Sequence, residues 1–243
     1  MKHDWPYPRW IAHRGAGKRA PENTLAAFRL GHQYGWRAFE CDVKLSGDGQ
    51  PFLMHDATLD RTTSGRGQAD AFTWAELSRL DAGGWHSAPY AGEPLPTLEA
   101  IASFCLANDC TLNIEIKPVP GTEARTGAAV ARAATALWRG ATPPLLSSFE
   151  IPALEAARDA VPELPRALLL KHKPSDWLAL AQGLACRAVV FDHRLMDAAA
   201  IQALHAAGLR ALVYTVNDAA RGDELFAWGL DGLISDAVDV FKP

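Results

Sequence analysis

The chain has 243 residues, of which 49% are hydrophobic and 21% are charged, so it is long enough for one large core and has the composition of an ordinary globular protein. Its formal net charge is −4 and its lysines and arginines are scattered, which argues against a nucleic-acid partner. The first residues lack the apolar segment of a secretory signal, and no run approaches the ~20 apolar residues of a membrane span. We therefore expect neither nucleic-acid binding nor membrane insertion.

The cysteines point to a reducing environment. None of the four cysteines, which are Cys41, Cys105, Cys110 and Cys186, has the C-x-x-C spacing of a metal or redox pair. Cys41 and Cys186 lie in or beside apolar runs, where a free thiol behaves as a small hydrophobic side chain. We expect four reduced thiols, which together with the N-terminal composition favour a cytoplasmic location.

The first predicted strand, residues 10–12, leads directly into His13, Arg14 and Gly15. Asn23 and Thr24 offer a helix cap ahead of an apolar stretch, so a helix is expected over 23–34. The imidazole and the guanidinium therefore lie at the carboxyl end of a strand, which is where parallel α/β folds bind ligands. This arrangement favours phosphate chemistry.

Two acids share one face of the second predicted strand, residues 38–45. Strand alternation sends Glu40 and Asp42 to one side and Cys41 to the other. Burying acids without partners costs free energy, so this strand needs a neutralising ion or base nearby. A metal ion would meet this need.

Two later motifs extend the set. His55 and Asp56 follow residues 51–54, and alternation along the predicted strand 111–116 pairs Glu115 with Lys117. The expected metal ligands are then carboxylates alone: Glu40, Asp42 and Glu115. Such a set suits one hard divalent cation, with Mg²⁺ favoured over Ca²⁺ and Mn²⁺, and it disfavours zinc.

Charge counting supports the metal. The three carboxylates together with Arg14 and Lys117 leave a net charge of −1, which repels a phosphodiester, whereas a divalent ion changes it to +1. We expect Arg14 to grip phosphate oxygens in a fork and Lys117 to add a point charge.

Short apolar strands alternate with amphipathic helices along the chain, which indicates a parallel sheet covered by helices. The eight predicted strands are 10–12, 38–45, 111–116, 145–148, 166–170, 188–191, 210–216 and 232–235. The predicted helices between them are 23–34, 98–108, 125–138, 151–159, 175–184, 197–207 and 219–228. Eight such units in about 250 residues favour a TIM barrel, although the alternation alone fits an open doubly wound sheet nearly as well.

Taken in order, these motifs resemble a known family. His-Arg-Gly with Pro21-Glu22-Asn23-Thr24, then Glu-x-Asp, His-Asp and Glu-x-Lys, are similar to the motifs of the glycerophosphodiester phosphodiesterases over essentially the whole chain. The likeness is strongest to the cytoplasmic bacterial enzyme. It implies a single TIM-barrel domain over residues 1–243 and the metal-dependent hydrolysis of glycerophosphodiesters to sn-glycerol 3-phosphate and an alcohol. It also implies that His13 and His55 form the general acid and base, and we favour His55 as the acid.

One connection is unusually long. Between Leu45 and Thr111 lie 65 residues with many glycines and prolines, and the resemblance implies a small insertion over about 56–97 that sits over the barrel mouth. A short helix is expected at 73–77. Trp85, His86 and Tyr90 could line a leaving-group pocket or pack against their own loop.

Other functions remain open at this point. A phospholipase-C-like cleavage lacks a membrane-docking segment, a glycosidase does not require the two histidines and two cations, and a non-catalytic phosphate-binding protein would not need the full set. Further strand-end residues could contact substrate: Ser147, Ser148, His172, His193, Asn217 and Asp236. The sequence fixes neither the head-group alcohol nor the oligomeric state, for which a homodimer stays open.

Overall fold

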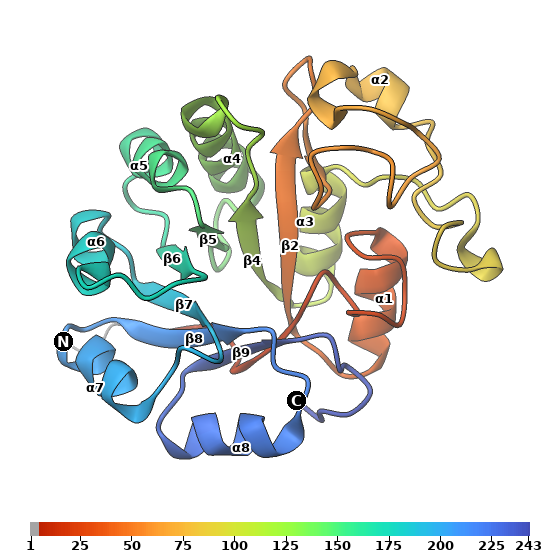
Figure 1. Ribbon diagram of the computed structural model, residues 1–243. Coiled ribbons are helices and arrows are strands. Elements are labelled where there is room, and N and C mark those ends of the chain that lie inside the picture. The colour runs from red at the N-terminus through yellow and green to blue at the C-terminus, as the bar shows by residue number, and fades with distance from the viewer. Residues whose placement is uncertain (1–4) are drawn as a thin grey trace.

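Within residues 5–243, which the computed structural model describes, eight parallel strands form a closed barrel (Figure 1). The strands are β1 (Trp10–Ala12), β2 (Ala38–Leu45), β4 (Thr111–Ile116), β5 (Leu145–Ser148), β6 (Arg166–Leu170), β7 (Ala188–Asp192), β8 (Arg210–Tyr214) and β9 (Gly232–Ser235). They pair in the order β1, β9, β8, β7, β6, β5, β4 and β2, and β1 also pairs with β2, which closes the ring. The predicted TIM barrel is confirmed, and the open sheet is excluded.

Six strands have the predicted bounds, and the differences in the other two are related. β7 continues to Asp192, and β8 ends at Tyr214 instead of Val216. Asp192 and Tyr214 are cross-strand partners, so β8 has no neighbour on this side beyond Tyr214. A ninth strand, β3 (Pro51–Leu53), was not predicted and pairs antiparallel with the last residues of β2. With three residues it is too short to show alternation.

Helices cover the outside of the barrel (Figure 1). They are α1 (Leu25–Gln33), α3 (Leu98–Ala107), α4 (Glu123–Leu137), α5 (Ile151–Ala160), α6 (Trp177–Gly183), α7 (Ala198–Ala206) and α8 (Ala219–Ala227), within two residues of the predicted bounds. The predicted start at Asn23 is wrong because Asn23 has a left-handed backbone with φ 60°, and Thr24 caps α1 by accepting from the Ala27 amide. Asn23 instead binds Asp42.

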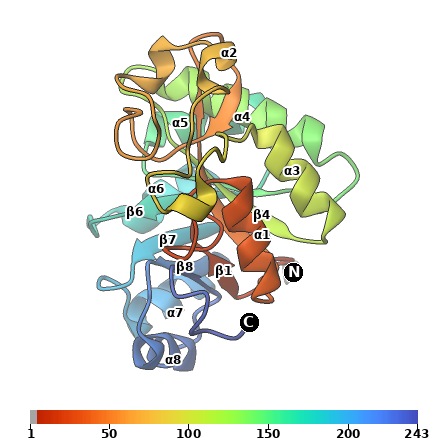
Figure 2. The ribbon, with the colours of Figure 1, turned by 90° about the vertical axis from the view of Figure 1, so that its right-hand side faces the viewer.

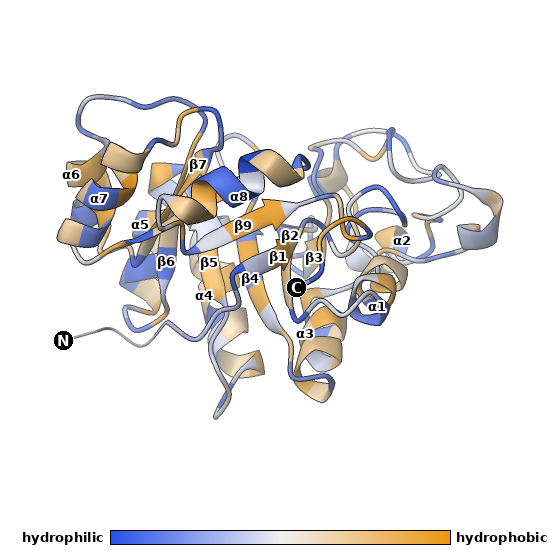
Figure 3. Ribbon diagram, turned by 90° about the horizontal axis from the view of Figure 1, so that it is seen from below, coloured by the Kyte–Doolittle hydropathy of each residue, from blue (hydrophilic) through white to orange (hydrophobic). Residues whose placement is uncertain are grey.

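The interior of the barrel has an apolar half and a polar half. The apolar half comes mainly from the inward faces of β1 and β6 to β9, with side chains that include Ile11, Leu169, Val190, Leu212 and Ile234. The inward face of β2 and β4 carries buried polar side chains instead, namely Glu40, Asp42, Asn113 and Glu115. Viewed from below, the strands are largely hydrophobic in colour, whereas many loops are hydrophilic (Figure 3). The polar half is where a functional site is expected.

The segment between β3 and α3 contains α2 (Trp74–Leu77) and the short 3₁₀ turns η1 (Ala69–Ala71) and η2 (Ala88–Tyr90). In two perpendicular views α2 lies above the carboxyl end of β2 (Figures 1 and 2). Together with β3 the segment forms a small core that includes Phe52, Leu59, Leu77 and Leu95. The predicted helix at 73–77 forms, with Thr73 as its capping residue.

The membrane and cysteine predictions can also be compared with the structure. No helix within residues 5–243 has the length and apolar character that a bilayer crossing requires. All four cysteines carry free, buried thiols, as the sequence predicts.

Candidate active site

A cavity of about 220 Å³ opens at the carboxyl ends of the barrel strands. Six of the seven predicted site residues line it: His13, Arg14, Glu40, His55, Glu115 and Lys117. The seventh, Asp42, contacts two of them from a fully buried position. A larger cavity of about 280 Å³ is lined by Trp5, Tyr7, three prolines and two arginines, and its described lining contains no acid or histidine. The smaller cavity is therefore the candidate active site.

Three buried carboxylates form one cluster. Glu40, Asp42 and Glu115 each offer an oxygen, and these oxygens lie within 4.8 Å of one another. Asp42 and Glu115 are cross-strand partners in β2 and β4, so the parallel register brings them together. Glu40 Oε1 is buried without a hydrogen-bond partner among residues 5–243. An oxygen-only cluster with an unused buried acceptor fits a hard metal ion.

The pKa values within the cluster diverge. Burial, followed by the charge of Asp42, raises the pKa of Glu115 to about 7, and the same two causes raise the pKa of Glu40 well above its usual value. Burial also disfavours the charge on Asp42, but Arg14 and Lys117 outweigh it and lower its pKa. Asp42 is thus ionised at neutral pH, whereas the raised pKa values of Glu40 and Glu115 favour their protonated forms when no cation is bound.

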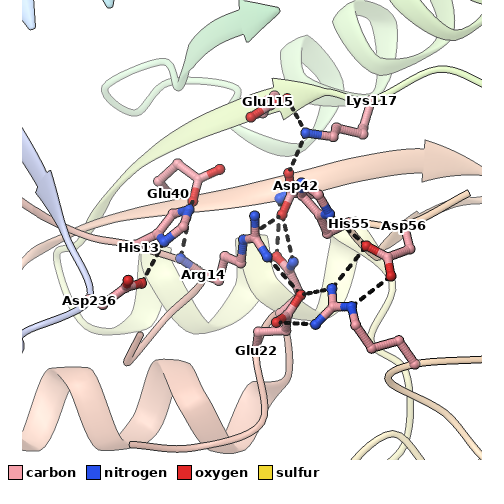
Figure 4. Close-up of polar contacts among 12 residues, drawn as sticks. His13, Arg14, Glu22, Glu40, Asp42, His55, Asp56, Glu115, Lys117 and Asp236 are labelled. Carbon is pink, nitrogen blue, oxygen red and sulfur yellow. Dashed lines mark hydrogen bonds and ion pairs between the residues drawn. The ribbon is translucent and has the colours of Figure 1, made fainter. Parts of the chain in front are cut away.

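Asp42 is also the most firmly held member. Asn23 Nδ2 donates to Asp42 Oδ2 over 2.8 Å, and the backbone amide of Asp42 donates to Asn23 Oδ1 over 3.0 Å. Arg14 Nε lies 3.2 Å from Asp42 Oδ2, and Lys117 Nζ lies 3.5 Å from Asp42 Oδ1 (Figure 4). Asn23 therefore holds the Asp42 carboxylate in place. Its left-handed backbone, a conformation that asparagine tolerates, accompanies these two hydrogen bonds.

The two cations expected to bind phosphate both face the cavity. Arg14 Nη1 donates to Glu22 Oε1 over 2.8 Å, and the Arg14 backbone amide donates to Glu40 Oε2 over 3.1 Å. Lys117 Nζ donates to Glu115 Oε1 over 2.6 Å. Each cation is held by acids on one side and remains accessible to a ligand in the cavity on the other.

A carboxylate holds each of the two histidines. His13 Nδ1 lies 2.6 Å from Asp236 Oδ1, and the other oxygen of Asp236 accepts from Asn217 Nδ2 over 3.1 Å. Because an ionised carboxylate only accepts, His13 Nδ1 carries the proton and Nε2 is directed to the cavity, 3.8 Å from Glu40 Oε2 (Figure 4). Gly17 lets the loop approach, since a Cβ there would lie 2.2 Å from the Asp236 carbonyl oxygen.

The second histidine has an equivalent partner. His55 Nδ1 lies 2.7 Å from Asp56 Oδ1, which leaves Nε2 as the ring nitrogen for a substrate. The buried ammonium of Lys44 donates to the His55 carbonyl over 2.9 Å and fixes the backbone. Burial lowers the pKa of His55 and also lowers that of Lys44, to about 8. His55 is thus held by both its ring and its main chain.

The structure adds residues to which the sequence gave no role. Asn113 lines the cavity, is 4% exposed, and neither amide atom has a hydrogen-bond partner in the described chain. A buried asparagine two positions before Glu115 was the available signal. Asp236 and Asn217 were only candidate substrate contacts, and here they position His13. Glu22 and Arg61 join the site through contacts between loops, which no local pattern indicates.

The remaining candidates lie elsewhere. Trp85 donates to the Ala82 carbonyl, and the His86 ring packs edge to face against both Trp85 and Tyr90. None of these three lines the described cavity, and neither does His172 or His193. The loop-packing alternative for the three aromatic residues is therefore the one observed.

The barrel with an acidic cluster, two positioned imidazoles and two cations at the strand ends defines a phosphate-ester enzyme of the TIM-barrel class. The sequence profile of the glycerophosphoryl diester phosphodiesterase family matches residues 13–240, and the chain belongs to this family. It is thus an enzyme of the phosphodiesterase group, as the sequence motifs predict.

Individual relatives and solved structures support the family assignment. The glycerophosphodiester phosphodiesterase of Caldanaerobacter subterraneus subsp. tengcongensis is 30% identical over 230 residues, covering 93% of each chain. A phosphodiesterase of Oleispira antarctica, solved in complex with the product sn-glycerol-3-phosphate, is 38% identical, covers 95% of this chain and 94% of its own, and superposes with a TM-score of 0.91. The glycerophosphodiester phosphodiesterase of Agrobacterium tumefaciens strain C58 is 29% identical with a TM-score of 0.81, over 96% and 98% of the two chains.

Proposed function

We propose that this enzyme hydrolyses glycerophosphodiesters to sn-glycerol 3-phosphate and an alcohol with the help of one divalent cation, Mg²⁺ being favoured over Ca²⁺ and Mn²⁺. The observation that carries the proposal is the joint placement of His13, His55, Arg14 and Lys117 around a buried acidic cluster in one cavity. The Oleispira antarctica relative bound to sn-glycerol-3-phosphate supports the product class.

Glu40, Asp42 and Glu115 would hold the cation. When bound, such an ion supplies positive charge for a phosphate oxygen and can accept a hydroxyl of the glycerol. Arg14 and Lys117 would bind the remaining phosphate oxygens, Arg14 through two donors and Lys117 as a point charge. The phosphate group would therefore lie in the cavity, in reach of both the bound cation and the two basic side chains.

The histidines would move the protons. His13, which carries its proton on Nδ1, would take a proton at Nε2 from the attacking hydroxyl, whether that hydroxyl belongs to water or to the glycerol. Asp236 stabilises the charge that then develops on the ring. His55 would deliver a proton from Nε2 to the departing alkoxide as its bond to phosphorus breaks. Burial lowers the pKa of His55 in the free enzyme, and an anionic phosphodiester beside it would raise that pKa, so that Nε2 would take up from solvent the proton that it then delivers.

A panel of glycerophosphodiesters tests the activity. Glycerophosphocholine, glycerophosphoethanolamine, glycerophosphoglycerol and glycerophosphoinositol would each be supplied, and release of glycerol 3-phosphate would be followed by a coupled dehydrogenase with and without EDTA. We expect turnover that EDTA abolishes. No glycerol 3-phosphate from any member of the panel would refute the proposal.

Metal binding is expected to weaken with acid. The raised pKa of Glu115, about 7, means that a proton must leave before this carboxylate can bind a cation, and Glu40 adds to the effect. Affinity for Mg²⁺ should therefore fall by about tenfold or more per pH unit below neutrality. Calorimetric titration of the metal-free protein between about pH 6 and pH 8 measures this. Equal affinity across the range would show that these carboxyls are not the ligands.

We expect the enzyme to be specific for the glycerol phosphate half of the substrate and to accept a range of alcohols in the other half. Arg14, Lys117 and the acidic cluster would all address the phosphate and glycerol, and the side-chain amide of Asn113, which has no hydrogen-bond partner within residues 5–243, would bind a glycerol hydroxyl. Asn113→Ala should raise KM for glycerophosphocholine about tenfold, in line with a lost hydrogen bond of about 1 to 1.5 kcal/mol. The slow hydrolysis of bis(p-nitrophenyl) phosphate should be unchanged by this variant.

Thr111→Val is the matched control. Thr111 is on the same face of β4, two positions earlier, and it does not line the active-site cavity. Its replacement should leave both substrates unaffected. If Asn113→Ala and Thr111→Val behaved alike, or if wild-type rates on the two substrates were comparable, the proposed glycerol recognition would be wrong.

A further inference from the structure

One guanidinium of the insertion contacts two acids that each hold a different part of the active site. Arg61 Nε and Nη2 donate to the two oxygens of Asp56 over 2.6 and 2.9 Å. Arg61 Nη1 and Nη2 donate to the two oxygens of Glu22 over 2.9 and 2.8 Å. All three groups are charged, since hydrogen bonds from Arg61 lower the pKa of Asp56 and, against the effect of burial, that of Glu22.

The two acids lead to two different functional groups. Asp56 Oδ1 is the partner of His55 Nδ1 at 2.7 Å, and Glu22 Oε1 is the partner of Arg14 Nη1 at 2.8 Å. Figure 4 shows Glu22 beside Arg14 and Asp56 beside His55. Glu22 lies in the loop between β1 and α1, whereas Asp56 and Arg61 follow β3, so the contact joins two loops.

We propose that Arg61 is a positioning residue that sets the geometry of the proton donor and of the phosphate-binding cation together, by clamping Asp56 behind His55 and Glu22 behind Arg14. This proposal rests on the proposed function for the roles of His55 and Arg14. It assigns to the insertion a task in the reaction itself, in addition to covering the barrel mouth.

The geometry explains why an arginine suits this position. A guanidinium presents its donors in a rigid planar fork, so it can bind two carboxylates at once, whereas an ammonium is a compact point charge on a flexible stem. Arg61 is 44% exposed at its side chain, so its ion pairs alone contribute little to the stability of the fold. A loss of this side chain should therefore affect the reaction more than the stability.

The test compares Arg61→Gln and Arg61→Lys with Arg66→Gln. Arg66 is the matched control, because it belongs to the same insertion and pairs with Asp60 at 3.4 Å, and its side chain is 81% exposed. Each variant is assayed on two substrates with the same glycerol phosphate half, glycerophosphocholine and glycerol 3-(p-nitrophenyl phosphate), and thermal unfolding is followed in parallel.

For Arg61→Gln we expect kcat on glycerophosphocholine to fall about 10- to 100-fold, the usual range for a residue that orients a functional group. KM should rise on both substrates, because Glu22 would no longer hold Arg14 in place for binding the phosphate. Arg61→Lys should recover less than half of the lost activity. Methylguanidinium at millimolar concentration should partly rescue Arg61→Ala, because the position is open to solvent, and it should not rescue His55→Ala. Arg66→Gln should behave as wild type.

The proposal can fail independently of the proposed function. His55→Ala is assayed alongside, and the loss of kcat in Arg61→Gln must depend on the leaving group in the same direction as the loss of kcat in His55→Ala, while KM, which reports on Arg14, rises on both substrates. A different pattern, an unchanged KM, full recovery with lysine, or no rescue by methylguanidinium would each overturn the role of Arg61. If Arg61→Gln does not fold, the lysine variant and the rescue of Arg61→Ala decide the matter.

Discussion

Replacing His13 or His55 by alanine is expected to lower kcat roughly 10²- to 10⁴-fold, the range for a lost general acid or base. The two variants should differ in their dependence on the leaving group. If His55 is the acid, its loss should matter much less when the leaving group is p-nitrophenol, which departs without protonation, provided the substrate keeps its glycerol phosphate half. Loss of His13 should impair both substrates equally. Steady-state kinetics on glycerophosphocholine and the p-nitrophenyl ester measures the difference.

His205→Ala is a suitable control, since His205 also pairs with a carboxylate, Asp231 at 2.7 Å, but lies on α7 outside the cavity. It should retain wild-type turnover. Equal impairment of His55→Ala on both leaving groups would remove the acid role from His55. The reverse pattern, with His13 sensitive to the leaving group, would exchange the two roles.

Removal of divalent metal is expected to abolish turnover, and Mg²⁺ or Mn²⁺ should restore it while Zn²⁺ does so poorly. The reason is the donor set, which consists of carboxylate oxygens without histidine or cysteine. Glu40→Ala and Asp42→Ala should lose metal affinity and activity together, since each supplies both charge and geometry. Calorimetry and activity on the same metal-free preparation provide the two measurements.

The two acid variants should not be equally stable. Asp42 is the partner of Arg14, Lys117 and Asn23, so its removal leaves buried donors unpaired and should also lower the melting temperature. Glu40 has fewer partners and a raised pKa, so Glu40→Gln should lose metal binding and activity without a loss of stability. Full activity of the EDTA-treated enzyme, or wild-type metal affinity in Glu40→Gln, would exclude the proposed ligands.

The parts of the site that could be predicted are those set by one strand or one neighbouring pair. Glu40 and Asp42 share a face because side chains alternate along β2, and Glu115 joins them because parallel strands end at the same edge. The bounds of six barrel strands could also be predicted, since most of these strands are short runs rich in apolar residues. β3 could not be predicted because three residues are too few to show the alternation of a strand, although this strand positions His55.

The parts that could not be predicted depend on which strands and loops meet. His13 and Asp236 are 223 positions apart, and they meet only because β1 pairs with β9 when the barrel closes. Arg61 and Glu22 are joined across 39 positions by two loops that have no periodic pattern. Asn113 had a readable signal, a polar side chain inside an apolar strand, but its lack of partners becomes apparent only from the packing around it.

Because β2 and β3 pair as an antiparallel hairpin, the length of the turn between them determines where His55 lies relative to the acids of β2. The backbone amide of Met54 donates to the Asp42 carbonyl, so the hairpin register determines how far His55 stands from the acids on the opposite arm. One residue added between Ser46 and Gln50 would shift the following segment by about 3.3 Å and turn its side chains to the other face. Insertions or deletions after Arg61 are therefore compatible with the chemistry, because His55 precedes them in the chain. The same changes in the five residues before β3 are not, because they would displace His55.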